Sequence, residues 1–140
     1  MGCHPPREEK TVSLEQSDAE AAAVAIAPRV TLADIEAAIA HRYHFTGGDA
    51  VWALQLKKTW NEEHQCYEAP RGDPLPEPLR LLSICLVVMK NGFTVIGKSA
   101  PASPANFNAE LGRKLAYEDC VRQIWPLMGF ALRERLACGR

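Results

Sequence analysis

Apolar residues recur every three or four positions after residue 31, the spacing that places side chains on one face of a helix. Four residues carry this spacing: Leu32, Ile35, Ile39 and Tyr43. Thr31 precedes them and Asp34 follows three positions after it, close to the arrangement in which two side chains cap the first turn of a helix. Gly47 and Gly48 come next, and glycine commonly ends helices. The pattern therefore predicts a helix from Thr31 to this glycine pair.

A second pattern lies between residues 81 and 100, where two apolar segments flank Asn91 and Gly92. Asn-Gly between apolar segments is a strong signal for a β-hairpin, because both turn positions favour positive φ. The first segment shows little alternation from Cys85 to Met89, which predicts a strand covered on both faces.

The longest helical pattern begins after Ser103, which can cap a helix, and Pro104, which suits the first helical position. Two neighbouring apolar stripes run along it: Phe107, Leu111 and Leu115 form one, and Ala116, Cys120 and Ile124 form the other. Pro126 predicts a kink or break, after which a short last helix would span residues 127–137. These elements predict a small α+β fold with an N-terminal helix, an antiparallel β-hairpin core and a long C-terminal amphipathic helix kinked near Pro126.

The remaining segments give weaker patterns. Residues 49–66 fit either a short helix capped by Asp49 or an extended ribbon. Residues 69–78 hold four prolines, which predicts an exposed loop without a regular element. Residues 1–29 are polar and then alanine-rich, so we expect a disordered or marginally helical extension. We assign residues 30–140 to a single small α+β domain.

Composition narrows the class of protein. The 140 residues are 47% apolar, enough for one core, and the net charge of −1 recruits neither nucleic acid nor an acidic membrane. The longest apolar run, residues 84–89, is far too short to span a bilayer, so we expect no membrane partner. Five cysteines without a CxxC pair or an apolar leader suit a reducing cytoplasm, and Cys85 and Cys120 fall within apolar patterns typical of a core.

Catalytic and metal-binding motifs are weak. His41, His44, His64 and Cys66 are the candidate zinc ligands, but their spacing matches no established zinc motif, so we expect no metal and no cofactor. The serines lack a nucleophile-elbow context, and neither a P-loop nor a dinucleotide-binding glycine motif occurs. We therefore expect a protein that is not an enzyme. Trp52, Trp60 and Tyr67 flank the proline-rich segment and suit either an exposed contact surface or a satellite core.

The polar junction between the hairpin and the long helix is the best candidate for binding. The N-terminal end of a helix offers unpaired backbone N–H groups to an anion, and amides, a ring and basic groups near it could hold a nucleotide. The candidate ligand-binding residues are Phe93, Lys98, Ser103, Asn106, Arg113 and Arg122. The alternative is that Ser103 only caps the helix, that Phe107 packs in the core and that the charged residues form a solvated face.

Three segments carry a resemblance to a known family: "KNGFTVIGKSA", "PANFNAELGRK" and "IWPLMGFALRERL". Together with residues 30–50, they resemble a widespread family of small tailed-phage and prophage proteins, named for gene products forty-nine and sixty-six of two enterobacterial phages. The chain departs from the expected family pattern between Val51 and Pro78, which is longer and more polar, and at Met128, where relatives often have an acidic residue. The resemblance implies an accessory protein of a phage, in the host cytoplasm.

We therefore expect a non-catalytic phage or prophage accessory protein that acts by binding, with counter-defence by sequestering a nucleotide-type immune signal as the first hypothesis. A regulator or inhibitor of a host protein and a nucleic-acid-associated phage regulator are the alternatives. The expected ligand is an anionic small molecule or nucleotide. The long helix has a second apolar stripe, formed by Trp125, Met128, Leu132 and Leu136, which predicts a homo-oligomer.

Overall fold

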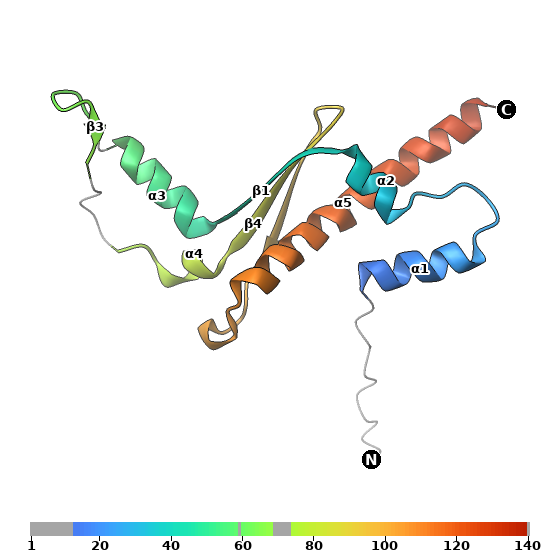
Figure 1. Ribbon diagram of the computed structural model, residues 1–140, viewed down its shortest axis with the longest axis horizontal. Coiled ribbons are helices and arrows are strands. Elements are labelled where there is room, and N and C mark those ends of the chain that lie inside the picture. The colour runs from blue at the N-terminus through green and yellow to red at the C-terminus, as the bar shows by residue number, and fades with distance from the viewer. Residues whose placement is uncertain (1–12, 59, 69–73, 140) are drawn as a thin grey trace, which may run out of the picture.

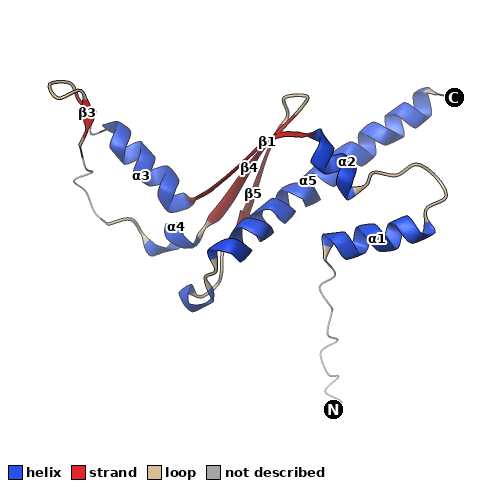
Figure 2. Ribbon diagram, viewed as in Figure 1, coloured by secondary structure: helices blue, strands red, loops and turns tan. Residues whose placement is uncertain are grey.

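A three-stranded antiparallel sheet lies at the centre of the computed structural model, which describes residues 13–58, 60–68 and 74–139 (Figures 1 and 2). Its strands lie in the order β1 (Ile39–Thr46), β4 (Ser83–Met89) and β5 (Thr94–Ser99). The 30-residue helix α5 (Ala109–Cys138) crosses one face of this sheet. The predicted α+β fold, with an N-terminal helix, an antiparallel hairpin and a long C-terminal helix, is confirmed.

The core lies between α5 and two of the strands, β4 and β5. Alternate residues of β4 are buried, and Cys85 and Val87 are fully covered beneath the helix. The opposite face of the sheet, which we call the open face, is left exposed in the described part of the chain, since Tyr43 and Ile96 are 54% and 61% exposed. The prediction of a strand covered on both faces holds fully for only one face of β4, since its intervening residues are partly buried.

Helix α5 approaches β5 so closely that only glycine fits at position 97. A Cβ atom there would overlap the carbonyl oxygen of Ala116 and lie 2.7 Å from the Sγ of Cys120. Cys120 itself is fully buried, as predicted, and its thiol donates to the carbonyl of Cys85 at 3.4 Å. The helix backbone thus rests on the sheet at this point.

The hairpin between β4 and β5 turns at Asn91-Gly92, as predicted. Gly92 has a φ of 86°, whereas Asn91 keeps a negative φ and accepts a hydrogen bond from the Phe93 N–H at 3.0 Å. The Gly92 N–H donates to Met89 O at 2.9 Å and the Met89 N–H donates to Phe93 O at 2.8 Å. The turn is thus a three-residue loop closed by a glycine bulge, and only one of its positions needs positive φ.

The predicted helix from Thr31 to Gly47 is wrong beyond residue 38. Helix α2 (Leu32–Ala38) has the expected cap, in which the Asp34 N–H donates to Thr31 Oγ1 at 3.1 Å. The chain then extends into β1, which pairs with β4 from Ile39 to Thr46. Pairing with an apolar strand that lies forty residues away outweighs the local helical period, because a sheet of two strands alone is marginal.

The glycine pair begins a helix instead of ending one. Helix α3 (Gly47–Lys58) starts after Thr46, whose Oγ1 accepts from the Asp49 N–H at 3.0 Å while Asp49 accepts from the Thr46 N–H at 2.8 Å. A small ribbon of β2 (Trp60–Asn61) and β3 (Cys66–Tyr67) follows. Residues 49–66 therefore contain both predicted alternatives, first a helix and then an extended ribbon.

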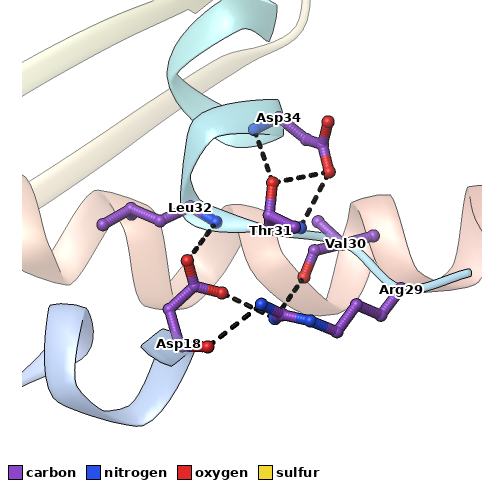
Figure 3. A network of polar contacts seen from close by, with 6 residues as sticks. All are labelled: Asp18, Arg29, Val30, Thr31, Leu32 and Asp34. Atoms are coloured by element: carbon purple, nitrogen blue, oxygen red, sulfur yellow. Dashed lines mark hydrogen bonds and ion pairs between the residues drawn. The ribbon is translucent and has the colours of Figure 1, made fainter. Parts of the chain in front are cut away.

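Helix α1 (Leu14–Val24) precedes α2 and is held to it by a polar network (Figure 3). Asp18 accepts from Arg29 at 2.6 Å and from the Leu32 N–H at 3.2 Å. This ion pair lowers the pKa of Asp18, with Arg29 the main cause. Of the two expectations for residues 1–29, the structure has the helix over its described part. Residues 1–12 lie outside the described residues, and the domain boundary at residue 30 stays a prediction.

Two predictions around the proline-rich segments need correction. Helix α4 (Glu77–Leu81) begins within residues 69–78, and residues 69–73 lie outside the described part of the chain. Helix α5 is continuous through Pro126, so no separate last helix exists, and a bend at that proline stays a prediction. A proline inside a helix removes one backbone hydrogen bond, and in a helix of this length the many others maintain the element.

Candidate functional site at the start of α5

The predicted ligand-binding residues divide among four places. Ser103 precedes the 3₁₀ turn η1 (Pro104–Asn106) and makes no capping bond, whereas Asn108 caps α5 by accepting from the Leu111 N–H at 3.0 Å. Ser103 therefore does not cap the long helix. Phe93 lies at the hairpin, at the opposite end of β5 from Ser103.

Lys98 and Arg122 lie away from the junction as well. The neighbours of Lys98 in β5, Val95 and Gly97, are buried toward α5, so the Lys98 side chain points to the open face. Arg122 is half-exposed and donates to the largely buried Glu118 at 3.3 Å, one turn earlier on α5. Asn106 and Arg113 are the two predicted residues that the structure brings to the start of α5, each at the wall of a small cavity.

The first cavity lies where β5 leaves the sheet and has a volume of about 100 Å³. Asn106, Asn108 and Ser99 contribute polar groups to its wall, and Leu111 and Leu115 contribute apolar ones. Phe107, expected in the core under the capping hypothesis, is 37% exposed and lines this cavity instead. The apolar stripe of Phe107, Leu111 and Leu115 thus faces the junction, while the stripe of Ala116, Cys120 and Ile124 faces the core.

The second cavity adjoins the first and also measures about 100 Å³. It shares Ser83 and Phe107 with the first, and its far wall is formed by His44 of β1 and Arg113 of α5. Asp49 lies at its end, where its carboxylate is already engaged by the Thr46 N–H. About 100 Å³ corresponds to the space of three to four liquid water molecules, so it suits one phosphate-sized group.

A wider recess of about 350 Å³ continues along β1 toward α2 and is lined by Glu36, Ile39, Arg42 and Tyr117. The guanidinium carbon of Arg42 lies 4.4 Å from the centre of the Tyr117 ring, a cation–π contact. Arg42 and His44 alternate with residues that face the open side, so both point to the side of the sheet that carries α5. We call the surface formed by Arg42, His44, Arg113 and Tyr117 the basic groove.

Two arginines and two carboxylates line the cavities of the basic groove: Arg42 and Glu36 in the recess, and Arg113 and Asp49 in the second cavity. The pKa of His44, an exposed residue, is lowered chiefly by partial desolvation of its ring and further by the positive charges of Arg42 and Arg113. Those two charges would be offset by a bound anion, which would also favour the imidazolium form of His44. Burial also raises the pKa of Tyr117, so its hydroxyl stays protonated as a hydrogen-bond donor.

Two cysteines of the described chain, Cys85 and Cys120, are buried where their thiols are unreactive. Burial raises the pKa of Cys85 and raises that of Cys120 to about 12, which keeps both thiols protonated. His41 and His44 point to opposite faces of β1, and the described residues contain no group of three or more side chains suited to a metal ion. No helix in the described part of the chain is long and apolar enough to cross a membrane. Trp52, Trp60 and Tyr67 are each roughly half-exposed.

Arg42 and Tyr117 were missed as candidate site residues, and His44 was considered only as a zinc ligand. The helical interpretation of residues 31–46 placed Arg42 and His44 on different sides of a helix, which concealed their common direction on a strand. The alternation of basic and aromatic residues in "HRYHF" was the available signal, since a period of two places alternate residues on one face.

The chain belongs to the Phage protein (N4 Gp49/phage Sf6 gene 66) family, whose profile matches residues 30–136. This match confirms the family that the sequence resembles and places the protein among phage proteins. Neither the curated proteins nor the solved structures contain a significant match to the chain.

Proposed function

We propose that this phage protein is an accessory protein without catalytic activity, which acts by binding an anionic small molecule of the nucleotide class in the basic groove. In this proposal it works in the host cytoplasm, where it withholds a nucleotide-type signal from a host defence system. Family membership supports the phage setting, and the ligand class is our inference from the groove.

One observation carries the proposal: His44 and Arg113, from elements nearly seventy residues apart, form the wall of one phosphate-sized cavity next to Arg42. Tyr117 and Arg42 line the adjoining recess of about 350 Å³, which is within the range of small-molecule sites. A phosphate would lie against Arg113 and His44, and the sugar or base would occupy the recess along Tyr117. Asn106, in the neighbouring cavity, would contribute an amide only to a ligand that extends past Phe107.

Ligand-induced stabilisation tests this proposal directly, because a ligand that binds only the folded state raises the melting temperature. A panel of linear and cyclic nucleotides, with inorganic phosphate and pyrophosphate, would be titrated into the full chain. We expect stabilisation by at least one nucleotide, lost in Arg113→Gln and retained in Arg122→Gln, a matched change at an exposed arginine of the same helix that lines neither the second cavity nor the recess. If no nucleotide stabilises the protein, or if both variants respond alike, the proposal is wrong.

Asn106→Ala separates the two small cavities. If the ligand extends into the first cavity, this change lowers affinity while the melting temperature of the free protein stays nearly constant. If the ligand stays in the basic groove, affinity is unchanged. In both cases the free protein keeps its stability, since Ser103 and Asn106 cap no part of α5. Phage plating on a host with nucleotide-signalled defence provides the biological readout, with Arg113→Gln expected to plate like a deletion.

Binding of a host protein is the second candidate, and the exposed aromatic surface of α3 and the β2–β3 ribbon favours it. Trp60 and Tyr67 pack edge to face with centroids 4.8 Å apart, yet remain 46% and 54% exposed. Aromatic residues with this exposure are enriched at binding hot spots. Trp60→Ala would abolish co-purification of a host protein under this hypothesis and leave nucleotide stabilisation unchanged.

A further inference from the structure

The two edges of the sheet differ in how their backbone groups are satisfied. At the β5 edge, Asp119 accepts from the Lys98 N–H at 3.0 Å and Gln123 donates to the Ile96 carbonyl at 2.8 Å. Both side chains come from α5, which therefore occupies this edge. An edge closed in this way cannot accept another strand.

The β1 edge has no such closure. The Gly47 N–H donates to Leu82 O at 2.9 Å, which continues the β1–β4 ladder. This bond shows which alternate residues of β1 are hydrogen-bonded to β4. In an antiparallel pair, alternate residues turn their backbone groups toward the neighbouring strand, so Tyr43 and Phe45 bond to β4 while Arg42 and His44 turn theirs outward. No described residue bonds to those outward groups, whereas the outward Thr46 N–H is taken by Asp49.

We propose that a second copy of this chain pairs with β1, antiparallel about a two-fold axis at Tyr43, and completes the basic groove. In this register Arg42 lies opposite the partner's His44, and His44 lies opposite the partner's Arg42. Each of these two pairs exchanges two hydrogen bonds, which satisfies all the outward groups of Arg42 and His44 on both strands. The proposal rests on the proposed function for its ligand, but the pairing itself does not.

The open face supports the same register. Ile96, Leu86 and Tyr43 are cross-strand partners and form one row that ends at the β1 edge with an exposed ring. Pairing about Tyr43 continues this row through the partner's Tyr43 across a joined six-stranded sheet. Aromatic pairs at such facing positions stabilise sheets.

The face of the sheet that carries α5 shows why the pairing of two β1 strands matters for ligand binding. Each α5 covers β4 and β5 but leaves much of the helix side of β1 uncovered, so two joined β1 strands would form the floor of a shared cleft. The partner's Arg42 would come next to His44, with Cα atoms about 5.5 Å apart as in a hydrogen-bonded pair. One protomer thus supplies His44 and Arg113 to an anion, and the other adds its Arg42.

Disulfide trapping tests the register. Facing residues of a non-hydrogen-bonded pair have Cα atoms about 4.5 Å apart, which a disulfide can span. Tyr43→Cys would be made in a chain whose Cys3, Cys66 and Cys138 are replaced by serine, leaving the buried Cys85 and Cys120. We expect rapid covalent dimer formation on mild oxidation. Ile96→Cys in the same background, similarly exposed on the open face but two strands from the axis, should form no covalent dimer.

Sedimentation equilibrium, which measures the oligomeric state, and the affinity for the stabilising nucleotide complete the test. The wild-type chain should be a reversible dimer, and Tyr43→Lys should be monomeric because two like charges would face each other. Tyr43→Lys should also lower affinity for the stabilising nucleotide at least tenfold, although residue 43 lies on the face opposite the groove. Ile96→Lys should alter neither property. His44→Pro, which removes an outward N–H that the monomer does not use, should also be monomeric and folded.

The outcomes distinguish this proposal from the proposed function. A wild-type monomer at high micromolar concentration, or a Tyr43→Cys chain that does not cross-link faster than Ile96→Cys, overturns the pairing. A monomeric Tyr43→Lys chain with full nucleotide affinity overturns the shared site and leaves the proposed function intact. A wild-type dimer that binds no nucleotide overturns the proposed function and leaves the β1 pairing intact.

Discussion

The β5 side and the β1 side of the same sheet are built on opposite principles. At β5, a helix backbone lies directly on a glycine, and helix side chains close the strand edge. At β1, the edge, the open face and much of the helix side stay accessible, and Arg42, Tyr43 and His44 are exposed. The comparison shows how one three-stranded sheet can place its stability at one edge and its candidate binding surface at the other.

The largest effect on the β5 side should come from Gly97→Ala. The added methyl group would overlap the backbone of α5, which cannot rotate away, so we expect a loss of about 3 kcal/mol or more in unfolding free energy. Gly129→Ala is the matched control, because a Cβ there meets nothing within 4 Å and alanine favours a helix by about 1 kcal/mol over glycine. Urea denaturation measures both. Equal midpoints for the two variants would contradict the close contact.

Gly92→Val should destabilise the hairpin that joins β4 to β5 by about 2 kcal/mol, since a β-branched residue resists a φ of 86°. Gly92→Asn should cost far less, because asparagine tolerates this region. Thermal unfolding of the two variants provides the measurement. A valine variant as stable as the asparagine variant would mean that the turn rearranges.

Opening the β5 edge should have a smaller effect on stability. Asp119→Ala and Gln123→Ala each remove a side chain that satisfies an edge backbone group, at a cost of about 1 kcal/mol. The double variant should also associate more strongly in sedimentation experiments, because β5 then offers an unpaired edge. Glu134→Ala, at an exposed position of the same helix, is the control and should change neither quantity.

The smallest effect should be a pH dependence on the β1 side. The pKa of His44 is lowered by partial desolvation, Arg42 and Arg113, so the folded state binds a proton less readily than the unfolded state. This contribution to stability is complete above the usual histidine pKa of about 6.5 and is lost as the pH falls through the lowered folded value. A bound anion favours protonated His44, so affinity should rise over the same range. Asp49 and Arg113 line the same cavity as His44, and Arg42 lines the recess along β1. His44→Gln should remove the pH dependence if the histidine causes it.

Several features were predictable from local sequence because they depend on local chemistry. The Thr31–Asp34 cap, the glycine turn and the burial of Cys85 and Cys120 each follow from residues a few positions apart or from apolar periodicity. The start of α5 was misplaced because Ser103-Pro104 and Asn108 both suit a helix start, and a 3₁₀ turn uses the first pair. Of the candidate ligand-binding residues, Asn106 and Arg113 line cavities at the start of α5, while Phe93, Lys98 and Arg122 lie elsewhere, and a role in binding stays a prediction for each.

The family, the α+β class and the long amphipathic helix could be predicted from the chain alone, since these depend on short motifs and on periods of two and 3.6 residues. Only the tertiary structure decided that residues 39–46 form a strand, because their helical period competes with a partner strand that is distant in sequence. As part of a strand, Arg42 and His44 point to the face of the sheet that carries α5, and His44 lines one cavity with Arg113. The groove therefore depends on long-range pairing, which no local pattern specifies.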